Sequence, residues 1–306
     1  MNYLEKIKRL QEILRENPSD NETRKTLALI LSENGFTQEA LANLTLISTY
    51  NEKDSSVYYN MGILYEKLKD TESAQRAYEK AVEISSRNTD AYYNLGLIYI
   101  QKSMYDDAKK CFFNVLKRDE NDANTWFNIG FCNFKQDDLA DARAFFEHAL
   151  ELNDEDIYAH FYLGNVFIKF GDNASARQCF EKVIELSPDY SWAYYNLALL
   201  DFKDGNISGA LENLENTLKY NPKDFEAYKI YYKILRKSNK QKKARDILTL
   251  GLKNCPNNGD LFYYLSEEFK NENKDRQKEA LTLALKNYKS LTVPQEIVRK
   301  KLASIN

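Results

Sequence analysis

The sequence has little glycine and proline, two histidines and no long run of apolar residues. Ten Gly, five Pro, 29% charged residues and 22 Tyr among 306 residues fit a long helical protein with large side chains between its helices. No stretch approaches the length of a membrane span, and the segment from Met1 to Leu14 has no apolar run that could serve as a signal peptide. These absences predict a cytoplasmic protein without a membrane span.

Residues suited to catalysis or metal binding are equally few. His148 and His160 are the only histidines, and no phosphate-binding, dinucleotide-binding, zinc-protease or nucleophile-elbow motif occurs. The sequence therefore predicts no enzyme, no cofactor and no metal site. A net charge of −3 gives no overall bias toward nucleic acid or acidic membranes. Reduced, mostly buried thiols are expected at the four cysteines, which lie far apart without a CxxC pair: Cys111, Cys132, Cys179 and Cys255.

A five-residue pattern recurs every 34 residues. Residues 92–96 read Tyr-Tyr-Asn-Leu-Gly, and related segments stand at 58–62, 126–130, 160–164 and 194–198. A fixed period of this size indicates an array of repeats in which each unit packs only against its neighbours.

Each period contains two helical patterns. Apolar residues recur at i, i+3, i+4 and i+7 over about 89–102 and again over about 105–118. The connection between them is short, so the two helices must be antiparallel neighbours. Gly96, at the eighth position, costs about 1 kcal/mol relative to Ala inside a helix, so we expect the backbone of a partner helix to pass close to it.

This repeat resembles the tetratricopeptide repeat family. The family pattern has a large aromatic at position 4, Leu at 7, Gly or Ala at 8, Tyr at 11, Ala at 20 and an aromatic at 24. Residues 89–122 depart from it at Val115 and Glu120, where the family has Ala and Pro. The resemblance implies an all-α, right-handed superhelical solenoid of antiparallel helix pairs, with about eight repeats and a capping helix at each end. The matching residues are Tyr92, Leu95, Gly96, Tyr99, Ala108 and Phe112.

The phase of the repeat predicts the boundaries. Residues 21–258 form seven 34-residue units without a gap, and residues 1–20 form an N-terminal capping helix. Residues 259–292 form an eighth, divergent unit with an insertion near 271–275, and residues 293–306 form a C-terminal capping helix.

In this family the first helices line the concave wall of the superhelix, so the resemblance implies a groove built from repeat positions 2, 5, 6, 9, 12 and 13. Position 6 often carries Asn, similar to the asparagine ladder of the O-GlcNAc transferase repeats, whose amides hold the backbone of an extended peptide. Position 13 often carries Lys, and position 5 carries aromatic residues that serve partly as packing. The candidate ligand-binding residues are Tyr59, Asn60, Tyr93, Asn94, Leu97, Ile100, Phe127, Asn128, Phe131, Phe134, Lys135, Asn165, Lys169, Asn196, Leu199, Phe202, Lys203, Lys229, Lys233, Arg236 and Lys237.

Two features of this groove indicate what kind of ligand it would bind. Apolar residues at positions 9 and 12 of the central units should leave a strip of exposed apolar surface, which usually marks an interaction site. The unit 225–258 has nine basic and two acidic residues, a net charge of +7, and four of the basic residues share one face of its first helix. The expected partner is another protein that presents an extended or helical segment with apolar, aromatic and acidic residues.

One known family function can be tested at this stage. The members that bind chaperone tails clamp a terminal carboxylate with five residues, and the chain supplies Lys25, Leu29, Asn60, Asp90 and Asn94 in those places. Three of the five do not match, and the aspartate has the wrong charge, so no carboxylate clamp is predicted.

The hypothesis is a non-enzymatic scaffold or adaptor for protein–protein interaction. Nucleic acid is not the expected partner, because Tyr231 and Tyr232 should point toward the core and offer no stacking platform. Two alternatives stay open: a self-associating subunit of a homo-oligomer, and a regulatory or targeting subunit of an enzyme complex.

Overall fold

Asparagine and aspartate side chains mark where most helices begin. The side chains of Asp20, Asp54, Asn88 and Asp122 each accept a hydrogen bond from a backbone N–H in the first turn of the helix that follows. Such a cap satisfies one of the donors that a helix start leaves without a partner. The acidic and amide residues between the helical patterns are thus helix starts.

A single left-handed residue reverses the chain inside each helix pair. We number repeat positions from residues 21, 55, 89, 123, 157, 191, 225 and 259, and position 15 then has a positive φ in seven successive repeats. This conformation suits glycine and is strained for most other residues. The residues are Gly35, Lys69, Ser103, Asp137, Gly171, Gly205 and Asn239.

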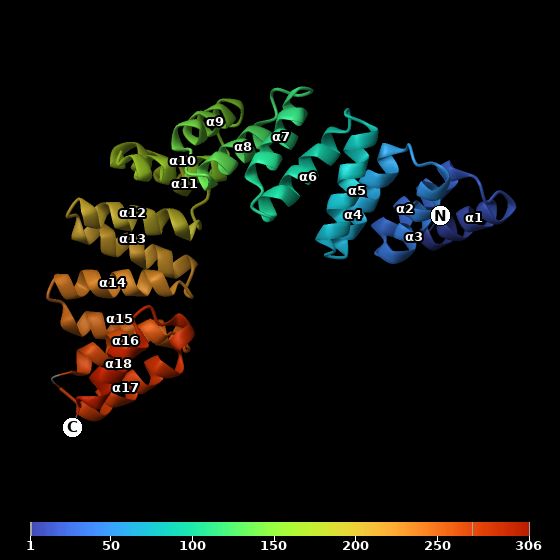
Figure 1. The fold of residues 1–306 in the computed structure, drawn as a ribbon. Helices are drawn as coiled ribbons and strands as arrows, with labels where there is room; N and C mark the ends of the chain where they lie inside the picture. Colours follow the sequence, from blue (N-terminus) through green and yellow to red (C-terminus); the bar gives the residue numbers. More distant parts are fainter. Residues whose placement is uncertain (1, 271, 306) are drawn as a thin grey trace. The chain divides into compact units, whose positions relative to one another are not determined.

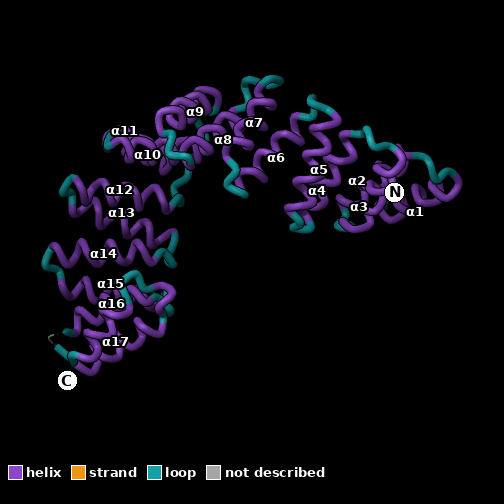
Figure 2. The backbone as a smooth tube through the Cα atoms, in the orientation of Figure 1, coloured by secondary structure: helices purple, strands orange, loops and turns teal. Residues whose placement is uncertain are grey.

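A computed structural model describes residues 2–270 and 272–305, and the chain is helical without a strand over these ranges (Figure 2). The chain forms two compact units, Met1–Ala159 and His160–Asn306. The insertion expected near 271–275 includes residue 271, which lies outside the described residues. The predicted all-α fold of consecutive helix pairs is confirmed.

In the first unit each helix packs against the one before it, with short turns between them (Figure 1). The helices are α1 (Tyr3–Glu16), α2 (Asn21–Glu33), α3 (Thr37–Tyr50), α4 (Ser55–Lys67), α5 (Thr71–Ile84), α6 (Thr89–Gln101), α7 (Tyr105–Leu116), α8 (Ala123–Lys135) and α9 (Leu139–Leu152). α10 (Ile157–Phe170) contains the boundary between the two units.

The second unit continues the same pattern and ends with a short helix. Its helices are α11 (Asn173–Leu186), α12 (Ser191–Lys203), α13 (Ile207–Tyr220), α14 (Phe225–Lys237), α15 (Gln241–Asn254), α16 (Gly259–Phe269), α17 (Lys274–Lys286), the 3-10 helix η1 (Tyr288–Ser290) and α18 (Gln295–Ala303). α18 packs on α17, and Val298 of α18 is fully buried there.

The glycine at position 8 faces an aromatic ring, so the expectation of a close helix backbone is wrong. A Cβ built on Gly96 would lie 2.7 Å from Cε1 and Cζ of Phe112, which is at position 24 of the same repeat. Gly62, Gly130 and Gly164 meet the ring at position 24 of their own repeats in the same way. The glycine is therefore needed for the volume of a ring rather than for backbone contact.

Positions 3 and 10 of the first helices are also buried, which the sequence pattern did not indicate. These side chains pack toward the second helix of the preceding repeat, as Ala91 and Ile98 do against Ala74 and Ala81. Burial on this side joins one repeat to the next. Examples that are at most 2% exposed are Val57, Leu64, Ala91, Ile98, Thr125, Cys132, Ala193 and Leu200.

Among the described residues, no helix combines the length and the apolar character that crossing a membrane requires.

Candidate functional site

The residues at positions 2, 5, 6, 9, 12 and 13 of the first helices form a surface that we call the first-helix face. In the unit Met1–Ala159 it belongs to α2, α4, α6, α8 and the start of α10, and in the unit His160–Asn306 to the rest of α10, α12, α14 and α16. Most of the predicted groove residues lie on it, and several hollows open there.

The hollow nearest the N-terminus lies between α2 and α4. It encloses about 210 Å³ and has an apolar floor that includes Leu29, Ile63 and Leu64. Lys25 and Lys67 stand at its edge with Asn60. Lys25 is already paired, because its Nζ lies 2.5 Å from Asp54, and Lys67 donates to the hydroxyl of Ser32 at 2.8 Å.

Two further hollows of the first unit share Tyr93 and Asn124. One, of about 380 Å³, lies between the start of α6 and the end of α7, and the other, of about 370 Å³, lies at the start of α8 and α10. Phe127 and Tyr158 line the second, and Tyr158 is 58% exposed. Together they form a pair of neighbouring hollows lined by aromatic rings.

The second unit has a hollow of the same kind at the equivalent repeat positions. It encloses about 440 Å³ and is lined by five aromatic residues and two asparagines. Trp192, at position 2, is 50% exposed. The lining residues are Phe161, Tyr162, Asn165, Tyr190, Trp192, Tyr195 and Asn196.

The aromatic residues at position 5 are packing residues as well as lining residues. Four of them pack on the ring at position 24 of their own repeats, and the ring centroids are 5.6–6.0 Å apart. Each of these four rings is therefore partly held in place by a buried ring of its own repeat. The pairs are Tyr59 with Tyr78, Tyr93 with Phe112, Phe127 with Phe146, and Phe161 with Phe180.

The amides of the asparagine ladder already donate hydrogen bonds within the chain. Asn128 Nδ2 donates to the hydroxyl of Tyr93 at 3.1 Å, and Asn94 Nδ2 donates to the hydroxyl of Tyr78 at 3.3 Å. Asn196 Nδ2 donates to a carbonyl of its own helix, that of Trp192. Whether these amides also hold a ligand stays a prediction.

The hydroxyl of Tyr78 belongs to a partly buried polar network. It donates to Glu66 Oε2 at 2.5 Å, and burial together with this carboxylate raises the pKa of Tyr78 far above its usual range. Burial also raises the pKa of Tyr93. Both tyrosines are therefore neutral hydrogen-bonding groups near neutral pH.

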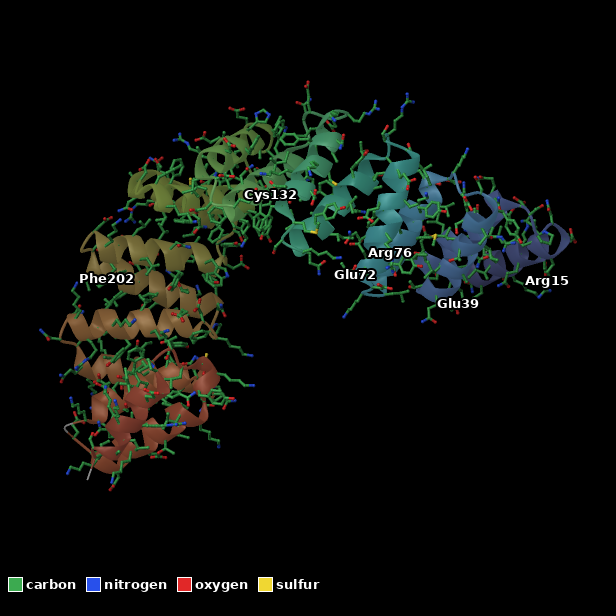
Figure 3. The ribbon with its side chains drawn as sticks, in the orientation of Figure 1. Arg15, Glu39, Glu72, Arg76, Cys132 and Phe202 are labelled. Carbon is green, nitrogen blue, oxygen red and sulfur yellow. The ribbon has the colours of Figure 1, made fainter. Side chains whose placement is uncertain are left out.

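The lysines at position 13 rest on neighbouring groups of the same unit. Lys135 Nζ lies 5.2 Å from the ring centre of Phe131, and Lys203 Nζ donates to Asn173 at 3.2 Å. In the second unit Lys237 Nζ lies 4.9 Å from the ring centre of Phe202, which is labelled in Figure 3. Aromatic rings of this face thus already form cation–π interactions with lysines of the same chain.

The basic cluster on α14 is largely neutralised inside the second unit, and the expectation that Lys229 faces an open groove is wrong. Lys229 is 6% exposed, and its Nζ lies 2.8 Å from Asp260 and 2.9 Å from Glu226. Burial alone would lower the pKa of Lys229, but the bonds to these two carboxylates outweigh it and the pKa is raised. Arg236 Nε lies 3.2 Å from the buried carboxylate of Glu268.

The remaining two cations of this cluster lie at the surface. Lys233 is exposed, and its Nζ lies 5.6 Å from the ring centre of Tyr264. Lys237 is exposed over the ring of Phe202. As expected, Tyr231 and Tyr232 of the same helix are buried, at 9% and 6% exposure.

The expected apolar strip is only partly exposed. Leu97 and Ile168 are 38% and 37% exposed, whereas the other members are half-buried. Phe131 stacks on Phe127 with ring centres 6.3 Å apart. The half-buried members are Ile100, Phe131, Phe134, Leu199 and Phe202.

Two aromatic residues of this face were missed by the sequence reasoning. Tyr158 and Trp192 occupy position 2, are more exposed than any member of the predicted strip, and line the aromatic hollows. The signal was available, because both residues are large aromatics at a repeat position that the helical spacing places on the solvent side of the first helix.

Neither histidine belongs to a cluster of potential ligands. Within the described ranges no three His, Cys, Asp or Glu side chains gather where they could hold a metal ion. His148 packs edge-on against Trp126, with centroids 4.7 Å apart, and its Nδ1 lies 2.9 Å from Glu151. Three cysteines are buried, and burial raises the pKa of the Cys111 and Cys132 thiols to about 12.

Solved structures that share this fold include proteins described as tetratricopeptide repeat proteins. A tetratricopeptide repeat protein from Parabacteroides merdae ATCC 43184 aligns at a TM-score of 0.60 and 17% identity, over 81% of this chain and 97% of that one. MamA from Desulfovibrio magneticus RS-1 aligns at 0.53 and 22%, over 56% and 97%. YrrB, described as a TPR protein with an unusual peptide-binding site, aligns at 0.51 and 28%, over 60% and 95%.

The sequence comparisons agree with these structures. A search of curated proteins returned no match. Models described as tetratricopeptide repeat match residues 55–88, 89–122, 121–189 and 167–230, and together they cover residues 55–230 without a break. The chain belongs to the tetratricopeptide repeat family.

Proposed function

We propose that this chain is a non-enzymatic scaffold that binds a segment of a partner protein on its first-helix face. The observation that carries the proposal is the recurrence, in both units, of a hollow lined at repeat positions 2, 5 and 6 by aromatic and asparagine residues, with a strongly exposed ring at position 2. Tyr158 is 58% exposed and Trp192 is 50% exposed. Exposed aromatic side chains beside a hollow are characteristic anchors of a protein interface.

The chemistry of the hollows suits a peptide segment. Their aromatic floors can take apolar or aromatic side chains, and the asparagine amides beside them offer carbonyl acceptors to a peptide backbone. YrrB, which is 28% identical to this chain, is described as having a peptide-binding site, and that likeness supports a ligand of the same class here.

The ends of the array fit the role of caps. α1 buries only Ile7 and Leu14 along one side, and α18 buries only Val298, while the remaining side chains of both helices are half-buried or exposed. A polar outer face on the terminal helices is what a repeat array requires to stay monodisperse. We include residues 3–16 and 295–303 as capping helices in the proposal.

Binding of selected peptides tests the proposal. Peptides are selected on the intact chain from a random phage-displayed library, and their affinities are then measured for wild type and for Trp192→Ala, Tyr158→Ala and the double variant Phe131→Ala with Phe134→Ala. Loss of an anchoring aromatic should weaken binding about tenfold or more. Tyr50→Ala, which removes a ring that is 79% exposed on α3, is the matched control and should change nothing.

The outcomes separate the alternatives. Unchanged affinity in all three groove variants would show that the first-helix face is not the site. Light scattering of the same samples addresses self-association: a mass that rises with concentration and falls in Trp192→Ala would favour a homo-oligomer whose face is occupied by its own copies.

A further inference from the structure

The two neighbouring hollows of the first unit carry an acidic rim. Among the residues that line them, Asp90, Asp119, Asp122, Glu155 and Asp156 are acidic and Arg118 is the one basic residue. The repeat 123–156, which supplies much of this wall, has eight acidic and two basic residues, a net charge of −6.

Some of these carboxylates have structural roles, and three do not. Asp122 and Asp156 cap α8 and α10, where they accept hydrogen bonds from backbone N–H groups. Asp90, Asp119 and Glu155 cap no helix, and all three are exposed. Within the described residues no Lys or Arg forms an ion pair with them. Their charge is therefore available to a ligand.

The rings beneath this rim add a second attraction for cations. Tyr93, Phe127 and Tyr158 line the hollows, and burial together with the nearby charge of Asp122 raises the pKa of Tyr93. A cation above an aromatic face and within reach of a carboxylate is held by both groups. The chain itself places a cation over a ring on the same face, where Lys135 lies over Phe131.

We propose that the occupant of these two hollows is an extended segment of a partner protein that carries Lys or Arg residues beside apolar or aromatic ones. The inference rests on the proposed function and names the class of partner for the first unit. It differs from the acidic segment expected from the sequence, because two of the four α14 cations on which that expectation depended, Lys229 and Arg236, are paired with carboxylates within the second unit. Complementary charge at such a rim chiefly raises the association rate and excludes the wrong partner.

Three labelled peptides of equal length test the charge. One contains Lys, Ser and Tyr, and in the other two Gln or Glu replaces every Lys. Fluorescence anisotropy with the full chain at low ionic strength should show that the Lys peptide binds about tenfold more tightly than the Gln peptide, that the Glu peptide binds more weakly than either, and that added salt removes the difference.

A pair of charge variants then locates the effect. Asp90→Asn with Glu155→Gln should weaken the Lys peptide about three- to tenfold and leave the Gln peptide unchanged. Glu39→Gln with Glu83→Gln changes the net charge by the same amount at exposed positions on α3 and α5, away from the hollows, and should have no effect; Glu39 is labelled in Figure 3.

The results distinguish this inference from the proposed function. Equal binding of the three peptides, or preference for the Glu peptide, would overturn the charge assignment and leave a peptide-binding scaffold. Equal loss in both double variants would attribute the preference to overall charge and overturn the assignment to these hollows. If none of the three peptides binds, this inference is wrong, and the proposed function then depends on the peptide selection alone.

Discussion

Replacing Gly96 by Ala sets two effects of opposite sign against each other. Alanine at a helix interior is favoured over glycine by about 1 kcal/mol. The new Cβ, however, would stand 2.7 Å from the ring of Phe112, which has no exposed surface and is packed in the core. Overpacking of a filled core costs about 1–3 kcal/mol. We expect the steric cost to exceed the gain, so that Gly96→Ala lowers the free energy of unfolding by about 1 kcal/mol.

The chain itself supplies the compensating change. Where position 8 is alanine, position 24 is leucine: Ala28 occurs with Leu44, and Ala198 with Leu214, and all four are buried. Phe112→Leu alone should cost about 1 kcal/mol for the lost contacts. The double variant Gly96→Ala with Phe112→Leu reproduces the natural pair and should lie within about 0.5 kcal/mol of wild type, which is a coupling of about 1–2 kcal/mol in favour of the pair.

Urea unfolding followed by circular dichroism measures the four chains of this cycle, and hydrogen exchange of the segment 89–122 reports whether the loss is local. The same comparison at Gly62, whose Cβ would come closest to its ring, at 2.4 Å from Tyr78, should give a larger loss. A Gly96→Ala variant more stable than wild type would refute the reasoning, because helix propensity would then have decided the outcome. Additive losses in the double variant would refute the volume pairing.

Three other changes are equally specific. Lys229→Met removes the cation that pairs with the fully buried carboxylate of Asp260 and should destabilise α16 to α18 by about 3–5 kcal/mol. Hydrogen exchange should show lost protection in these helices but not in α2 to α5. Ser103→Gly relieves a residue at φ 60° and should raise the free energy of unfolding by about 0.5–1 kcal/mol; a lower value would contradict the strain. Iodoacetamide at neutral pH should label Cys255 well before the fully buried Cys132, because burial raises the pKa of the Cys132 thiol. The same pKa shift predicts how stability depends on pH. The Cys132 thiol stays protonated up to about pH 12 in the folded state but only to about pH 9 in the unfolded chain. Its contribution to the free energy of unfolding is therefore complete below pH 9 and is lost between pH 9 and 12. A Cys132→Ala variant should lose less stability than wild type over that range.

The fold could be predicted because the spacing of apolar residues within each helix and the contacts between successive helices both repeat every 34 residues. Apolar residues at helical spacing, repeated every 34 residues, specify helices and specify which helix each one meets. The reversal at position 15 was overlooked although Gly35, Gly171 and Gly205 share that position. Lys69 and Ser103 adopt the same conformation in other repeats and hide the signal, since neither residue type indicates a positive φ.

The asparagine ladder shows why the candidate site was harder to predict. The amide of Asn128 is engaged because the preceding repeat has a hydroxyl at position 5, that of Tyr93. Where the preceding repeat has Phe161 instead, the amide of Asn196 donates to its own helix. The sequence shows the same asparagine at position 6 in each of these repeats. The hydrogen bond of Asn128 or Asn196, however, depends on which residue stands at position 5 of the preceding repeat.

The charge that the α14 cluster offers to a ligand was overestimated for the same physical reason. Counting charges within the repeat 225–258 places Lys229 and Arg236 on one helix face, with Glu226 as the one acid of the repeat that pairs with either of them. Their partners, Asp260 and Glu268, belong to the next repeat and stand on α16. The acidic rim of the first unit keeps its charge when neighbouring repeats are considered, because within the described residues no basic residue of a neighbouring repeat pairs with Asp90, Asp119 or Glu155. In a repeat array the charge available to a ligand is what remains after each repeat has paired with its neighbours, and that remainder is negative at the aromatic hollows of the first unit.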